Sequence, residues 1–255
     1  MQRAAQAGVF RILIPGLNIT SSQSVVRLAD SHPMLYAAVG VHPTDAAVWE
    51  RKTLNELRGI ASGSSKVVAI GEIGLDYYWN SAPHELQGAV LREQLNLAAE
   101  LGLPVILHMR EAKDAPFGSC GVDLLQILEQ WCGQLHAGRS PLANRPGVLH
   151  SFSGTLETAQ SAMRLGFCIG VTGPVTFENA SQRKDIITAL PLDHLLIETD
   201  APFLAPHPYR GKRNEPAYVR LIADKIALLH SCSLDRVAEV TSKNAERLFA
   251  WKETA

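Results

Sequence analysis

Three features of the sequence predict an α/β fold of the (β/α)8, or TIM-barrel, type. Short apolar runs alternate with longer amphipathic stretches, which is typical of βα units built around a parallel sheet. The apolar runs consist mainly of valine, isoleucine and leucine, as strands covered on both faces do. Several runs end in a histidine or a carboxylate, which is where a barrel carries its functional residues. Because 255 residues suit one barrel, we expect a single domain over residues 1–255.

Seven apolar runs are predicted to be strands. They are Arg11–Gly16, Tyr36–Pro43, Lys66–Asp76, Pro104–Arg110, Gly147–Gly154, Phe167–Gly173 and Leu195–Pro202. Helical periodicity lies between them, most clearly over residues 84–101, and Gly102 is the expected end of that helix. A last helical pattern covers residues 234–252. An eighth strand should precede the helical pattern of residues 2–8, so we predict a barrel whose first strand is missing.

The overall composition excludes several classes of protein. A hydrophobic fraction of 46% and a net charge of −1 indicate a globular chain with a sizeable core and no electrostatic basis for wrapping long duplex nucleic acid. No apolar segment is long enough to cross a bilayer, and the start of the sequence does not have the pattern of a signal peptide. The four cysteines match no zinc-finger spacing, which is typical of free thiols in a reducing compartment. We therefore expect a cytoplasmic protein without membrane association, and the oligomeric state is left open.

Four predicted strand ends carry side chains that can bind a metal ion. These are Glu72, His108, His150 and Asp200. Because the carboxyl ends of parallel strands meet at one rim of a barrel, we expect the four side chains to converge. Histidine nitrogen and carboxylate oxygen suit a divalent cation such as Zn²⁺, Mn²⁺ or Mg²⁺. His42 ends an earlier strand and either lines the same pocket, where it is a candidate for substrate binding, or forms a hydrogen bond within the turn at Pro43.

The motifs GEIGLDYY, LPVILHMR, VLHSFSG, IGVTGPVTF, LLIETDAPFL and GKRNEP occur in this order, and together they resemble the TatD-like metal-dependent DNase family. The resemblance covers nearly the whole chain. It implies a barrel of the metallo-dependent hydrolase type and a divalent-metal phosphodiesterase activity on DNA. By motif, Glu72 resembles the carboxylate that bridges two ions, and His108 and His150 resemble two later histidine ligands. Asp200 resembles the last ligand, which also accepts a proton from the attacking water, so Asp200 and Glu72 are the predicted catalytic residues.

The sequence departs from the family pattern in one respect that concerns the metal. The resemblance implies a His-x-His pair on the first strand, and the sequence contains no such pair. One ion would depend on that pair together with Glu72 and Asp200, whereas the other would use Glu72, His108 and His150. We therefore expect one or two divalent ions per chain, with the second held weakly or not at all.

Basic and aromatic residues near the predicted strand ends are candidates for substrate binding. Arg210 and Arg213 follow the last strand, on the side of a barrel mouth where phosphates often bind, and Arg110 lies two residues after His108. Tyr77 follows the strand of Glu72, and its ring either stacks on a terminal base or packs in the core. The predicted partner is DNA, at a strand end or as a single strand.

These observations predict a metal-dependent hydrolase acting on ester bonds, namely a deoxyribonuclease that cleaves phosphodiester bonds with metal-activated water. An amidohydrolase that cleaves C–N or ester bonds is the first alternative, because the same barrel and ligand types support that chemistry. A truncated barrel that is weakly active or inactive is the second, because an unclosed barrel exposes strand edges that favour association.

Overall fold

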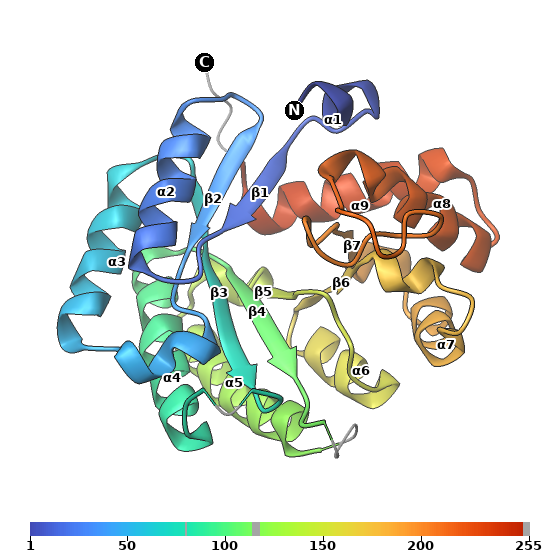
Figure 1. Cartoon of the computed structure of the whole chain (residues 1–255). Coiled ribbons are helices and arrows are strands. Elements are labelled where there is room, and N and C mark those ends of the chain that lie inside the picture. The colour runs from blue at the N-terminus through green and yellow to red at the C-terminus, as the bar shows by residue number, and fades with distance from the viewer. Residues whose placement is uncertain (80, 114–117, 252–255) are drawn as a thin grey trace.

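The computed structural model describes residues 1–79, 81–113 and 118–251, and within them seven parallel strands form one sheet. The strands follow one another across the sheet in chain order (Figure 1). They are β1 (Ile12–Pro15), β2 (Leu35–Val39), β3 (Val67–Asp76), β4 (Val105–Arg110), β5 (Gly147–Leu149), β6 (Cys168–Val171) and β7 (Leu195–Ile197). All seven predicted strands are present, but β5 and β7 end at Leu149 and Ile197, before the predicted ends at Gly154 and Pro202.

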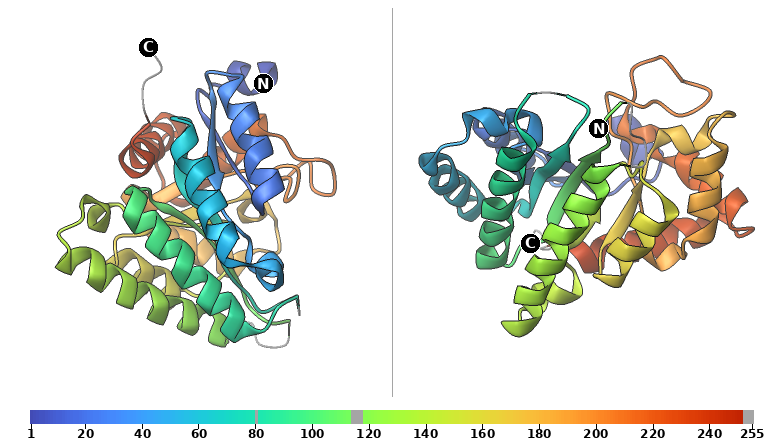
Figure 2. Two further views of the ribbon diagram at one scale, coloured as in Figure 1. Left: turned by 90° about the vertical axis from the view of Figure 1, so that its left-hand side faces the viewer. Right: turned by 90° about the horizontal axis from the view of Figure 1, so that it is seen from below.

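Helices cover the outside of the curled sheet (Figure 2). In the described ranges they are α1 (Gln2–Gln6), α2 (Ile19–Asp30), α3 (Arg51–Gly63), α4 (His84–Leu101), α5 (Ser119–Ala137), α6 (Leu156–Arg164), α7 (Ser181–Ala189), α8 (Val219–Leu229) and α9 (Leu234–Phe249). The 3₁₀ helices are η1 (Pro43–Val48), η2 (Pro141–Asn144), η3 (Gly173–Thr176), η4 (Leu192–His194) and η5 (Pro216–Tyr218). None of these helices is both long and apolar enough to cross a membrane.

The ends of several helices follow from local sequence. α4 stops at Gly102, which has the left-handed conformation with φ 66°, as the sequence predicts. α2 lies in a serine-rich stretch for which the sequence predicts no element, and it begins because the Asn18 side chain accepts a hydrogen bond from the Ser21 amide at 3.0 Å. α9 ends at Phe249, and Lys252, the last residue of the predicted final helix, lies outside the described residues.

β1 and β7 are the two edges of the sheet, since these strands are not paired with each other in the part of the chain that the structure describes. α1 lies beside η5 near the β7 edge, and the Arg3 guanidinium forms an ion pair with Glu215 there. The fold is therefore an α/β barrel-like sheet of seven strands. That the strand needed to complete a (β/α)8 barrel is the first one stays a prediction.

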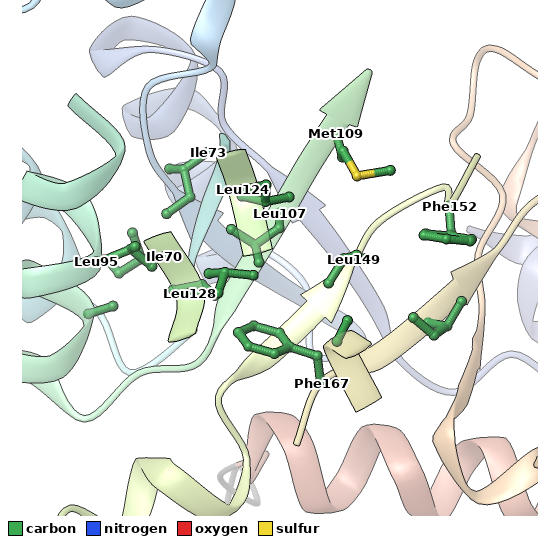
Figure 3. Close-up of a cluster of buried hydrophobic side chains, with 14 of the residues drawn as sticks. Ile70, Ile73, Leu95, Leu107, Met109, Leu124, Leu128, Leu149, Phe152 and Phe167 are labelled. Atoms are coloured by element: carbon green, nitrogen blue, oxygen red, sulfur yellow. The ribbon is translucent and has the colours of Figure 1, made fainter. Parts of the chain in front are cut away.

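Two apolar clusters lie on opposite sides of the sheet. The outer cluster fills the space between the strands and the helices, and part of it is seen in Figure 3 around Leu107, Leu124 and Phe167. The inner cluster is smaller and lies on the concave side, where Leu248 and Phe249 of α9 join it. Its members from the strands are Tyr36, Ala38, Val68, Ala69, Ile106, Val148, Cys168 and Leu196. The space above this inner cluster, toward the strand ends, is left to polar side chains.

β3 departs from strict alternation, and this departure sets the position of Glu72. Against β4, Ile70 pairs with Val105 and Ile73 with Leu107, so β3 contains one extra residue between these two pairs. Further along the same strand, Gly74 has φ 145°, and a Cβ atom there would overlap the carbonyl oxygen of His108. Only glycine fits this close approach of β3 to β4.

Candidate metal centre

Polar side chains follow the inner apolar cluster toward the carboxyl ends of β4, β5 and β7. Each lies two positions after an inner apolar residue, and residues two apart on a strand share a face. The pairs are Ile106 with His108, Val148 with His150, and Leu196 with Glu198. These polar groups therefore project into the concave space near the carboxyl ends of the strands, which is the position of active sites in α/β barrels.

A compact group of metal-binding atoms surrounds Glu72, which is only 8% exposed. The Glu72 Oε1 atom lies 2.9 Å from His108 Nδ1 and 3.8 Å from His42 Nε2. The rings of His42 and His108 are 4.4 Å apart and meet edge to face. One donor atom from each of the three residues lies within 4.8 Å of the other two. An ion bound at about 2.0–2.2 Å from such ligands needs only a small inward shift of these atoms.

The other nitrogen of each of these histidines is held by a local partner. His108 Nε2 lies 2.9 Å from the Oδ2 atom of Asp76, which ends β3 and is 1% exposed. His42 Nδ1 lies 2.7 Å from the Thr44 hydroxyl within η1. Outer hydrogen bonds of this kind fix the ring orientation and leave the remaining nitrogen aimed at a metal ion. His42 thus forms the predicted hydrogen bond in the turn at Pro43 and also lies near Glu72, while its role in substrate binding stays a prediction.

A second group contains the other two predicted ligands. His150 Nε2 lies 3.4 Å from Asp200 Oδ1, and His150 Nδ1 lies 2.9 Å from Glu198 Oε2. Glu198 Oε2 also accepts a hydrogen bond of 2.9 Å from the Ser151 amide. Glu198 therefore orients His150, and His150 Nε2 and the Asp200 carboxylate remain to face an ion or a substrate. A Cβ atom at Gly170 of β6 would overlap the Glu198 carboxylate, so glycine makes room for this arrangement.

The loop that carries Asp200 is fixed by a buried amide. Asp200 has φ 56°, a left-handed conformation that aspartate tolerates better than most residues. The Asn214 side chain donates hydrogen bonds to the carbonyl oxygens of Thr199 at 2.6 Å and Phe203 at 2.7 Å, which lie on either side of Asp200. The sequence suggests only a helix cap for Asn214, whereas the structure shows that it positions this loop.

The group of side chains around Glu72 and the group around His150 influence each other's pKa values. Burial would raise the pKa of Glu72, yet the hydrogen bond from His108 and the positive charges on His150, His108 and His42 lower it to about 2. Burial and the neighbouring His108 lower the pKa of His42 to about 4, so this ring is neutral near pH 7. Leu107 of β4 pairs with Leu149 of β5, so His108 and His150 follow at adjacent positions of neighbouring strands.

The pKa values of His108 and His150 are raised, whereas those of Glu72 and His42 are lowered. Burial opposes a charge on His108, but its hydrogen bonds to Asp76 and Glu72 outweigh burial and raise its pKa. Burial also opposes a charge on the largely covered His150, but the charge of Glu198 and the hydrogen bonds that His150 donates to Asp200 and Glu198 raise its pKa well above the ordinary value. The neighbouring carboxylates therefore favour a proton on each of these rings, and a bound cation would compete with that proton because metal ligation needs a neutral imidazole.

The donor set fits a divalent ion of the kind that histidine and carboxylate bind. Neutral imidazole nitrogen with carboxylate oxygen suits Zn²⁺ or Mn²⁺, and the carboxylates alone would suit Mg²⁺. His42, Glu72 and His108 provide a compact three-residue set in the described residues. His150 and Asp200 provide two further donors at the same strand ends.

The predicted substrate-binding residues lie in different surroundings. Arg110 is exposed, and its guanidinium lies 4.1 Å from the ring centre of Tyr78. Arg210 and Arg213 are exposed in the loop between β7 and η5, and the Arg210 guanidinium lies over the Phe177 ring at 4.4 Å. Tyr77 corrects the stacking prediction, since it is 6% exposed and its hydroxyl donates to Asp123 at 2.7 Å. Its ring is therefore packed and does not face a substrate.

Comparison with known proteins extends over nearly the whole chain. A profile of the TatD related DNase family matches residues 1–250. The uncharacterized metal-dependent hydrolase YabD of Bacillus subtilis is 39% identical over 249 residues, covering 98% of this chain and 91% of the relative. The 3'-5' ssDNA/RNA exonuclease TatD of Erwinia tasmaniensis is 38% identical over 255 residues, covering 98% and 92%.

A solved structure agrees with these sequence relatives. The TatD homolog YjjV of Escherichia coli superimposes with a TM-score of 0.85 at 35% sequence identity, covering 98% of this chain and 90% of the other. The fold, the order of the motifs and the extent of the family match therefore point in the same direction. The chain belongs to the TatD related DNase family.

Proposed function

We propose that this metal-dependent hydrolase is a nuclease that cleaves phosphodiester bonds of single-stranded nucleic acid, working from a strand end. The observation that carries the hydrolase chemistry is the convergence of His42, Glu72 and His108 within 4.8 Å beside the His150 and Asp200 pair. The named activity of the Erwinia tasmaniensis relative supports the choice of nucleic acid as substrate.

The proposed ligands divide into a compact set and an outlying pair. Glu72, His108 and His42 would hold one divalent ion, and His150 with Asp200 would contribute to it or hold a second ion next to Glu72. A divalent ion bound here would lower the pKa of a coordinated water and stabilise negative charge on the phosphate. We propose one tightly held ion, because the described donors form one compact set.

Asp200 is the proposed proton acceptor. Its side chain is 31% exposed, so water can reach it, and its Oδ1 atom lies 3.4 Å from His150 Nε2. A carboxylate in this position can accept a proton from an attacking water and orient that water toward phosphorus. Glu198 would keep the His150 ring in place during this transfer, and Asn214 would hold the backbone of Asp200.

Exposed arginines are proposed to bind the phosphates of the substrate. Arg110 lies at the end of β4, next to the histidines, and Arg210 and Arg213 lie in the loop after β7. A guanidinium offers several donors in one plane, which suits the two free oxygens of a phosphodiester. These residues would supply the positive charge that the overall composition lacks.

The test uses the purified chain with Mn²⁺, Mg²⁺ or Zn²⁺ and single-stranded oligodeoxynucleotides labelled at the 5′ or the 3′ end. We expect metal-dependent shortening from one end, and a decrease in kcat of about 10²–10⁴-fold for Asp200→Asn. Glu246→Gln, a surface substitution on α9, is the control and should retain activity. Hydrolysis of a small amide in place of DNA would favour an amidohydrolase, and inactivity with every metal and substrate would indicate an inert barrel. Calorimetric titration that finds two tight ions per chain would overturn the single-ion proposal.

A further inference from the structure

Two aromatic residues directly after β3 are tied to the metal centre through Asp76. The amides of Tyr78 and Trp79 donate hydrogen bonds to Asp76 Oδ1 at 2.9 Å and 3.0 Å. The other oxygen of the same carboxylate lies 2.9 Å from His108 Nε2. One buried carboxylate therefore fixes both a candidate metal ligand and the turn that presents the two rings.

Arg110 completes this group from the neighbouring strand. It is paired with Asp76 in the register of β3 and β4, and it lies two residues after His108, on the same face of the strand. Its guanidinium carbon is 4.1 Å from the centre of the Tyr78 ring and 5.7 Å from that of Trp79. The two rings themselves meet edge to face at 4.8 Å, so the three side chains form one aromatic and cationic cluster.

The exposure of the cluster distinguishes it from ordinary packing. Trp79 is 52% exposed, whereas Tyr77, two residues earlier, is buried and donates a hydrogen bond to Asp123. In the described residues no carboxylate lies within ion-pair distance of Arg110. Stacking on aromatic rings leaves the N–H groups of a guanidinium free for another partner. The protein thus holds a large exposed ring and an unneutralised cation next to its metal-binding side chains.

We propose that Trp79, Tyr78 and Arg110 form the subsite for a nucleotide next to the cleaved bond. The face of Trp79 stacks on the unpaired base, and Arg110 binds the phosphate of that nucleotide while resting on Tyr78. Single-stranded nucleic acid is recognised by this combination of ring and cation, because every base has a π-face and every nucleotide a phosphate. The inference rests on the proposed nuclease function and assigns part of its substrate recognition.

The experiment compares Trp79→Ala, Trp79→Phe and Trp79→Leu with the unchanged chain. The probes are a fluorescein-labelled single-stranded oligothymidylate and an oligomer of equal length whose end nucleotides are abasic. KM and kcat are measured with Mn²⁺, and binding is measured by fluorescence anisotropy in a chelator. Loss of one stacked base should weaken binding of oligothymidylate and raise its KM about 5- to 100-fold in Trp79→Ala and Trp79→Leu. Trp79→Phe should recover most of the affinity, and the abasic oligomer should bind all variants equally.

Arg110 is tested through the salt dependence of binding. Arg110→Ala should weaken both oligomers and reduce the slope of log affinity against log salt by about 0.7, the value for one phosphate contact in a single strand. Arg139→Ala, just beyond the end of α5, and Phe10→Ala, an exposed ring before the amino end of β1, are the matched controls and should behave as the unchanged chain. Circular dichroism and thermal unfolding check that each variant is folded.

The outcomes separate this inference from the proposed function. If the unchanged chain cleaves oligothymidylate and Trp79→Ala does so with the same KM and affinity, the subsite is wrong while the nuclease function stands. If Trp79→Ala weakens the abasic oligomer as much as oligothymidylate, base stacking is likewise excluded. If the unchanged chain neither binds nor cleaves either oligomer, both the function and the subsite are refuted.

Discussion

Replacement of Glu198 by glutamine should weaken metal binding without unfolding the protein. One carboxylate oxygen of Glu198 holds both His150 Nδ1 and the Ser151 amide, each at 2.9 Å. Glutamine has nearly the same size, so it fits the space beside Gly170 and its oxygen can still accept from Ser151. What is lost is the negative charge that keeps His150 oriented and basic.

The expected size of the effect follows from these two contacts. A hydrogen bond to a charged group contributes about 1.5–3 kcal/mol, and one between neutral groups about 0.5–1.5 kcal/mol. Neutralising the oxygen therefore weakens each contact by about 1 kcal/mol, or about 2 kcal/mol for both. This corresponds to about a 30-fold loss of affinity, within the 10–100-fold range typical of residues that orient metal ligands.

The assay is competition between the protein and a fluorescent chelator for Zn²⁺, with kcat on single-stranded DNA measured in parallel. Glu239→Gln removes a carboxylate that pairs with Lys243 on the surface of α9, and it serves as the matched control. Far-ultraviolet circular dichroism verifies the fold of both variants. Equal Zn²⁺ affinity of Glu198→Gln and the unchanged chain would show that His150 either needs no orienting partner or does not bind the ion.

Three further outcomes are expected. His42→Ala removes a neutral donor from the compact set, so Zn²⁺ affinity measured by calorimetry should decrease at least about 10-fold; an unchanged affinity would exclude His42 as a ligand. Asn214→Ala leaves two backbone carbonyls without their donor, so urea unfolding should show a loss of about 1–3 kcal/mol, and no loss would contradict its positioning role. The metal-free chain should be most stable near pH 6.5. The pKa of Glu72 is lowered to about 2 and that of His42 to about 4, so stability is lost as pH falls below their ordinary values of 4.5 and 6.5. The pKa values of His108 and His150 are raised from 6.5, so their contribution is lost as pH rises through the folded-state values. Thermal melts in a chelator measure this profile, and a midpoint that climbs steadily in alkali would contradict it.

Much of the fold and the positions of the main polar residues could be predicted from the sequence. The seven strands are continuous apolar runs, and such runs with helical stretches between them leave few arrangements other than a parallel sheet. His108 lies near the carboxyl end of β4 and His150 directly follows β5, and so their proximity follows from the parallel pairing of these strands. The contacts of Asp76 and Asn214 could not be foreseen in this way, because both depend on which atoms of distant segments meet after the sheet has curled.

Local alternation explains why the side of the sheet on which Tyr77 lies was harder to predict than that of Arg110. Arg110 lies two residues from His108 on a regular strand, so its side of the sheet follows from the period of two. Tyr77 follows a strand with an extra residue between Ile70 and Ile73, and a count of alternate positions along β3 no longer identifies the inner face. The same extra residue allows Glu72 to face the histidines while both isoleucines remain in the outer core. The extra residue of β3 that brings Glu72 to the histidines therefore also interrupts the alternation from which the positions of neighbouring residues could be predicted.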